Sequence, residues 1–146
     1  MILRSASLLS LLLMLLTVPA TTSFAEDSDK PHKVVIQVST GAALSQKVAI
    51  NNAEDLQESY GSENIHIVVV AYGPGLTLLK ENSPSASRIE SLAAQGVVFV
   101  AGAQGMKKLA DSSGGEPALL ESVEVVPLGV VRVLELQEQG YAYIRP

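Results

Sequence analysis

The chain has 146 residues, enough for one domain, and 47% of them are hydrophobic, which excludes an intrinsically disordered protein. It contains no cysteine, and this excludes disulfides, thiolate metal sites and a cysteine nucleophile. A formal net charge of -5 and an aromatic content of 4% argue against a surface that binds phosphate backbones or stacks on bases, so we expect no nucleic-acid partner.

Residues 1–25 have the three parts of a secretory signal peptide. Arg4 carries the positive charge, residues 8–18 form an apolar run, and Ser23-Phe24-Ala25 offers small residues at the cleavage positions. The run is shorter than the roughly 20 apolar residues that span a bilayer, so stable membrane insertion is not expected. Cleavage after Ala25 would export the protein. Its small size, the lack of cysteine and the lack of an N-x-S/T site favour the bacterial periplasm.

Five short runs rich in β-branched residues predict strands. They cover residues 34–38, 65–70, 97–100, 123–126 and 141–144. The second and third are continuously apolar, which is typical of parallel strands that are covered on both faces. Residues 26–33 are polar and acidic and contain Pro31, so we predict a flexible leader there, followed by a single domain of residues 34–146.

Three helical patterns separate these runs. They extend from Leu44 to Tyr60, from Ser85 to Gln95, and within Gly129 to Gln139. Each pattern ends in a glycine that allows a left-handed turn into the next strand. Helices that alternate with strands predict an α/β domain, with a mostly parallel five-stranded sheet and helices on both faces.

The first helix has an apolar stripe with one polar member. At i, i+4 spacing the stripe contains Leu44, Val48, Asn52, Leu56 and Tyr60, and it is joined by Ala49 and Ala53. A buried asparagine needs hydrogen-bond partners, so Asn52 would either tie the helix to a neighbouring loop or contact a ligand.

Four loops follow the predicted strands, at the edge of the sheet where open α/β proteins bind ligands. They are Ser39-Thr40-Gly41, Tyr72-Gly73-Pro74-Gly75, Gly102-Ala103-Gln104-Gly105 and Pro127-Leu128-Gly129. Each leads into a helix or helical turn, whose first N–H groups can receive an anion. The glycines would equally serve tight turns alone. Neither the dinucleotide fingerprint nor the P-loop spacing is met, so no nucleotide cofactor is predicted.

The two histidines do not predict a catalytic or metal site. His66 lies inside the second strand run, far from the carboxyl ends, where a histidine is usually structural, and His32 lies in the predicted leader. Two histidines without cysteine make no metal constellation, so no metal and no other cofactor is expected.

The chain resembles the DsrE/DsrF-like family, which has the YchN-like fold, in a branch that carries a signal peptide. The matching stretches are Lys33–Ser39, Asn51–Ala53, Val69–Gly75, Ser91–Val97, Val125–Val131 and Leu136–Pro146. The resemblance implies a homo-oligomer, often a trimer or hexamer. It also implies that active members carry persulfide sulfur on a cysteine, in a segment like F-x-A-C-x-x-T-M after the third strand. Here that segment runs from Phe99 to Met106, and Gly102 occupies the cysteine position.

Without that cysteine, transfer through a cysteine persulfide is chemically impossible for this chain alone, so the sequence does not predict an enzyme. Two functions remain open. One is an exported, non-catalytic module that binds a small neutral or anionic ligand or serves assembly. The other is an accessory subunit of periplasmic sulfur relay or sulfur oxidation, working with a cysteine-bearing partner. The predicted pocket residues are Ser39, Asn52, Tyr72, Gly73, Gly75, Gly102, Gln104, Met106 and Gly129. The pocket would be either open beside Gly102 or collapsed.

Overall fold

The structure, a computed structural model, describes residues 30–146 and has an α/β fold around one five-stranded parallel sheet. The predicted signal peptide lies outside the described residues. The strands are β1 (His32–Val38), β2 (Ile65–Ala71), β3 (Val98–Gly102), β4 (Val123–Val126) and β5 (Ala142–Ile144). They lie in the order β4-β3-β2-β1-β5, with every neighbouring pair parallel. The predicted fold class is therefore confirmed.

Strand β1 begins at His32, two residues before the start that its apolar run predicts. His32 pairs with Ile65 and Lys33 with His66, and the His32 N–H donates to the Asn64 carbonyl at 2.8 Å. Backbone pairing with β2 therefore extends the strand into polar residues, which the side-chain pattern could not indicate.

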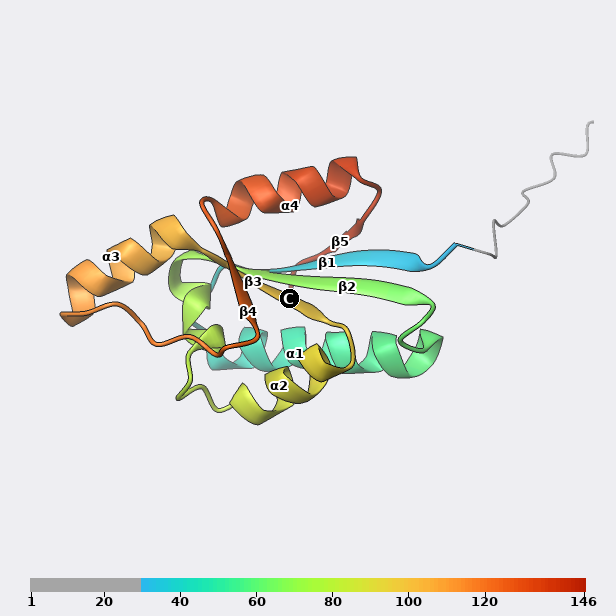
Figure 1. The fold of residues 1–146 in the computed structure, drawn as a ribbon, viewed down its shortest axis with the longest axis horizontal. Coiled ribbons are helices and arrows are strands. Elements are labelled where there is room, and N and C mark those ends of the chain that lie inside the picture. The colour runs from blue at the N-terminus through green and yellow to red at the C-terminus, as the bar shows by residue number, and fades with distance from the viewer. Residues whose placement is uncertain (1–29) are drawn as a thin grey trace, which may run out of the picture.

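Helices cover both faces of the sheet, as predicted (Figure 1). They are α1 (Ala43–Tyr60), the 3₁₀ helix η1 (Gly73–Leu79), α2 (Ala86–Ala94), α3 (Ala103–Ser113) and α4 (Gly129–Glu138). The strand order explains their placement. From β1 to β4 the chain steps in one direction across the sheet, but β5 returns to the far side of β1. Right-handed crossovers then place α4 on the opposite face from α1 and α2. Helix α3 extends from the carboxyl ends of the strands (Figure 1).

Two hydrophobic clusters follow from the alternation of side chains along the strands. Val34, Ile36 and Val38 of β1 belong to the larger cluster, with residues of α1 and α2. Val35 points to the other face, into a small cluster beneath α4 that also contains Val133. The α4 face of the sheet therefore has one helix over it and the smaller core.

The predicted stripe on α1 is confirmed at Ala49 and Ala53 and wrong at its two ends. Ala49, Ile50, Ala53 and Gln57 are the buried residues of this helix. Leu44 is 74% exposed and Tyr60 44% exposed. Ala49 and Ala53 belong to the larger hydrophobic cluster, and Ile50, which the stripe did not include, is buried with them.

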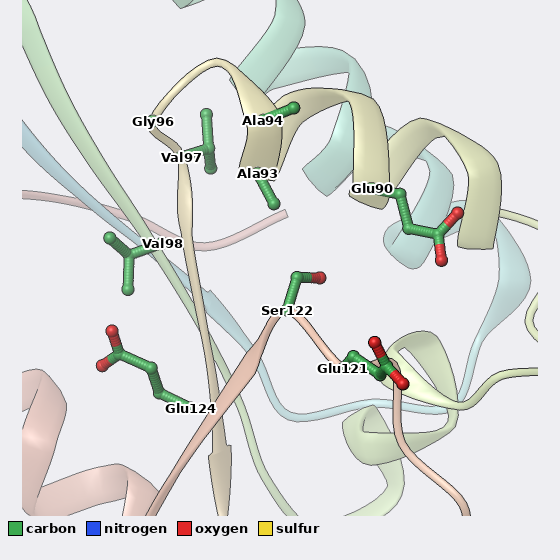
Figure 2. Close-up of a pocket in the computed structure, with 9 residues that line it drawn as sticks. All are labelled: Glu90, Ala93, Ala94, Gly96, Val97, Val98, Glu121, Ser122 and Glu124. Carbon is green, nitrogen blue, oxygen red and sulfur yellow. The ribbon is translucent and has the colours of Figure 1, made fainter.

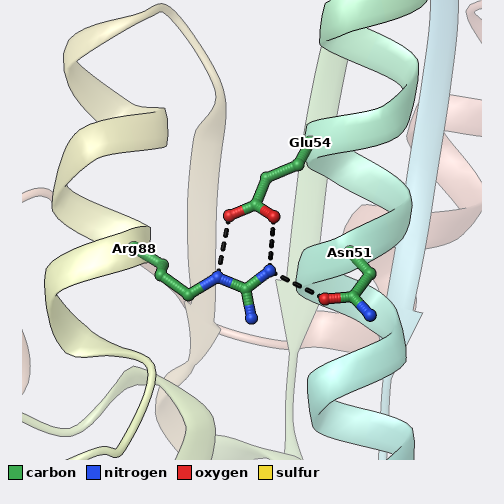
Figure 3. A network of polar contacts seen from close by, with 3 residues as sticks. All are labelled: Asn51, Glu54 and Arg88. Atoms are coloured by element: carbon green, nitrogen blue, oxygen red, sulfur yellow. Dashed lines mark hydrogen bonds and ion pairs between the residues drawn. The ribbon is translucent and has the colours of Figure 1, made fainter.

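An ion pair joins α1 to α2, and it uses Asn51 rather than Asn52 (Figure 3). The Arg88 guanidinium donates two hydrogen bonds to the Glu54 carboxylate, one of them from Nε at 2.8 Å. It donates a third to Asn51 Oδ1 at 2.7 Å. This fork holds the pKa of Glu54 below its ordinary value, chiefly through the hydrogen bond from Arg88.

Candidate functional site

Three of the four predicted loops meet at the carboxyl edge of the sheet and enclose a cavity of about 130 Å³. Its walls come from the ends of β2, β3 and β4 and from the first turns of α3 and α4. The lining residues are Tyr72, Gly73, Gly102, Gln104, Gly105, Lys108, Leu128, Gly129 and Val130. The loop after β1, which contains Ser39, contributes none of them.

At the glycines of this site, backbone segments from different loops pack in close contact. A Cβ placed on Gly102 would lie 2.9 Å from the Gly129 nitrogen and 3.2 Å from Tyr72 Cβ. A Cβ on Gly105 would lie 2.8 Å from the Gly73 nitrogen. The two contacts with backbone nitrogens are shorter than real Cβ contacts, so a side chain at either glycine would force the backbone to shift. The cavity lies beside Gly102, but the Gly102 position itself has no room for a side chain.

Tyr72 forms one wall of the cavity, and a chain of two hydrogen bonds through Gln37 links its hydroxyl to Tyr143 on the α4 face of the sheet. The Gln37 amide donates to Tyr72 Oη, and the Tyr143 hydroxyl donates to Gln37 Oε1. Burial raises the pKa of Tyr72 above its ordinary 10.0. The nearby Tyr143 raises this pKa further, and Arg145 partly opposes the rise. Tyr72 is therefore a neutral, fixed wall at physiological pH.

The electrostatics of the cavity favour an anion. Helices α3 and α4 both begin at it, and neither has a side-chain cap at its N-terminus. Their free N–H groups and dipoles place partial positive charge there. Lys108 adds a full positive charge, and the lining contains no aspartate or glutamate. One N–H is already used, because Gln104 N–H donates to the Pro127 carbonyl at 3.3 Å.

Four predicted site residues do not line the cavity. Met106 packs against the larger hydrophobic cluster. Gly75 fits beneath the end of β1, where a Cβ would lie 2.0 Å from the Val38 carbonyl oxygen. Ser39 follows β1 and is not a lining residue, although its carbonyl oxygen would lie 4.0 Å from a Cβ placed on Gly73. Asn52 lies in the middle of α1, nine residues from its first residue. At 1.5 Å per residue that is roughly 13 Å along the helix axis.

The structure also adds residues that the sequence did not single out for the pocket. Lys108 was not among the predicted pocket residues, while Gly105, Leu128 and Val130 belong to predicted loops or helices. Lys108 lies four residues after Gln104 on α3, so both side chains are on the same face of the helix and both line the cavity. His66 is exposed at the amino end of β2, opposite the cavity edge.

A larger hollow of about 650 Å³ lies at the amino end of β3 and β4, beside α2. Figure 2 shows Glu90, Glu121 and Glu124 around it. It is shallow and acidic, and nothing at it suggests a ligand. Within residues 30–146, no group of three or more histidine or acidic side chains is placed to hold a metal ion. In the same part of the chain, no helix has the length and apolarity needed to cross a membrane.

Comparison with known proteins agrees on the fold. The model of the DsrE/DsrF-like family matches residues 32–146. A protein of unknown function from Methanobacterium thermoautotrophicum, MTH1491, is similar in structure with a TM-score of 0.70 and 32% identity, over 79% of this chain and 99% of that one. The ychN protein of E. coli is similar with a TM-score of 0.61 and 17% identity, over 79% of this chain and 99% of its own, which shows the fold alone. No curated protein matches the chain.

Proposed function

Because the chain belongs to the DsrE/DsrF-like family, we propose that it is an exported, non-catalytic module of that family that binds a small anion. One observation carries the proposal. Two uncapped helix N-termini and Lys108 converge on a single cavity whose lining has no acidic residue. Each helix N-terminus contributes about 0.3–1 kcal/mol to anion binding at an exposed site. The chain has no cysteine, so the site binds without covalent sulfur chemistry.

The size of the cavity limits the ligand. At about 130 Å³ it is well below the roughly 300–1,000 Å³ of pockets that hold drug-sized ligands or cofactors. A small oxyanion such as sulfate, sulfite or thiosulfate fits this volume and the donors, which are backbone N–H groups, the Gln104 amide and the Lys108 ammonium.

Calorimetric titration of the purified protein with sulfate and thiosulfate tests the proposal. Lys108→Gln should weaken binding several-fold, whereas Lys107→Gln, an exposed lysine outside the lining, should not. Because one ionic contact is removed, the salt dependence of binding should also fall in Lys108→Gln alone. Absence of binding by the unmodified protein at millimolar anion would refute the proposal.

Two further parts of the proposal concern the state of the protein in the cell. Cleavage after Ala25 predicts that the periplasmic form has an intact mass beginning at Glu26. A full-length, membrane-bound product would contradict this. Resemblance to the family supports a homo-oligomer, a trimer or hexamer, and light scattering at tens of micromolar would detect it.

The alternative is an accessory subunit of periplasmic sulfur relay or sulfur oxidation. This role is favoured because the chain keeps a cavity beside Gly102, the position where active relatives carry the sulfur-bearing cysteine. A cysteine-bearing family member encoded beside this chain would favour the accessory role. Incubation with thiosulfate or a persulfide donor should leave the mass of this chain unchanged under both functions.

A further inference from the structure

The cavity at the carboxyl edge of the sheet has two chemically different walls. Helix α3 supplies the polar side chains, which are the Gln104 amide and the Lys108 ammonium. The start of α4 supplies aliphatic side chains, those of Leu128 and Val130. The two helix starts are in contact, because the Gln104 N–H donates to the Pro127 carbonyl at 3.3 Å. Hydrogen-bond donors and apolar surface are therefore brought together around one small cavity.

Tyr72 adds to the apolar wall rather than to the polar one. Its hydroxyl is occupied elsewhere, because it accepts a hydrogen bond from the Gln37 amide. The inner end of the side chain lies at the cavity, since Cβ, Cγ and Cδ1 of Tyr72 are the atoms nearest to a Cβ placed on the lining residue Gly129. Tyr72 therefore presents carbon atoms beside the start of α4.

An inorganic oxyanion uses only half of this lining. Sulfate has oxygen atoms on every side, so its outer oxygens face the aliphatic wall without hydrogen-bond partners, which costs free energy. Leu128 is 40% exposed and Val130 57% exposed, so this wall is in contact with water when the cavity is empty. A ligand with carbon atoms on that side displaces the water favourably, while its charged head contacts the donors.

The volume of the cavity sets the length of the apolar part. About 130 Å³ equals the liquid volume of about four water molecules, at roughly 30 Å³ each. This leaves room for a charged head group and about two carbon atoms.

We propose that the site takes a short-chain organic monoanion, a carboxylate or sulfonate with a small alkyl group. The head group contacts Gln104, Lys108 and the free N–H groups, and the alkyl group packs on Leu128 and Val130. This inference rests on the proposed function and names the ligand class of that site.

Calorimetric titration of the unmodified protein at constant ionic strength tests the ligand class. Formate, acetate, propionate and butyrate share one head group and differ in alkyl length. Each carbon added from formate to propionate should tighten binding about two- to fourfold, because a fully buried CH₂ contributes about 0.8 kcal/mol and an open wall covers it only in part. Propionate should also bind more tightly than sulfate. The gain should stop near butyrate, when the cavity is full.

Val130→Thr and Val131→Thr form a matched pair, since the two valines are neighbours on α4 and only Val130 lines the cavity. Both valines are exposed, so both variants should fold, which circular dichroism checks. Val130→Thr should reduce the ratio of propionate affinity to formate affinity at least about twofold, and Val131→Thr should leave that ratio unchanged. Lys108→Gln should weaken the binding of both carboxylates by the same factor, because it removes a contact with the head group alone.

Equal affinities for formate and propionate, or tighter binding of sulfate than of propionate, would overturn the inference and leave the proposed anion site standing. The same holds if Val130→Thr keeps the affinity ratio of the unmodified protein. A gain that continues through octanoate would also overturn the inference, because the tail would then lie on exposed apolar surface outside the cavity. Failure of every anion to bind, with sulfate and formate included, would instead refute the proposed function and the inference with it.

Discussion

The ring of Tyr72 packs directly on the backbone of Gly129. A Cβ placed on Gly129 would lie 2.8 Å from both Cβ and Cδ1 of Tyr72. The first residue of α4 is thus held against the residue that follows β2, and the cavity lies where these two segments meet the start of α3. This contact explains why Tyr72, Gly102 and Gly129 belong to one site although they are far apart in the sequence.

Gly129→Ala should destabilise the protein by about 1–3 kcal/mol, because the added methyl group overpacks a position closed by the Tyr72 ring. Helix propensity alone would predict the opposite sign. Gly41→Ala is the control, since its Cβ would meet neighbours at 3.5 Å or more. Urea denaturation measures both variants. A Gly129→Ala protein as stable as the unmodified chain would contradict the packing described here.

Gly102→Cys should not recreate a reactive sulfur carrier. Its Cβ would press on the Gly129 nitrogen, so the variant should lose about 1–3 kcal/mol of stability. The thiol would also be shielded and should react with a thiol reagent more slowly than Leu44→Cys, which is exposed. Intact mass after incubation with a persulfide donor gives the second readout. Rapid sulfur uptake at position 102 would show that α4 moves away readily.

Ionisation of Tyr72 should lower the free energy of unfolding at alkaline pH. Burial raises its pKa in the folded protein, so the unfolded chain ionises first. The stabilisation is complete below the unfolded pKa, near the ordinary value of 10.0, and is lost as the pH rises through the folded pKa. Tyr72→Phe should remove this part of the alkaline fall, whereas Tyr60→Phe should keep it. Denaturant unfolding from about pH 8 to pH 11 measures the difference.

The Arg88–Glu54 pair should have the opposite pH dependence. Arg88 lowers the pKa of Glu54, so its stabilisation is present above the unfolded value, near 4.5, and is lost as the pH falls through the folded pKa. Both side chains are more than one-third exposed, at 37% and 40%, so Glu54→Gln should cost less than about 1 kcal/mol at neutral pH. The cost should shrink toward zero in acid. Glu58→Gln, whose carboxylate lies outside this fork, is the control. A cost for Glu54→Gln that does not depend on pH would contradict the role of the ion pair.

Short-range patterns were sufficient for most of the fold. The β-branched runs indicated all five strands within about two residues, and glycines with positive φ do follow α1, α2 and α4, at Gly61, Gly96 and Gly140. The buried side of α1 was predicted only in part, because Ala49 and Ala53 were joined to the stripe and are buried, whereas the buried Ile50 and Gln57 were not included. The full length of α3 was missed because its sequence is polar and gives it little contact with the sheet.

The sequence by itself determined the fold class, the edge of the sheet where the cavity lies and the lack of a cysteine that could carry persulfide sulfur, since these depend on strand pattern and composition alone. Only the tertiary structure decided which loops enclose the cavity. Tyr72, Lys108 and Gly129 come together because the return of β5 to the far side of β1 places α4 on the opposite face of the sheet from α1 and α2. That reversal brings the start of α4 over the ends of β2 and β3, and it is a long-range property of strand order that no local pattern contains.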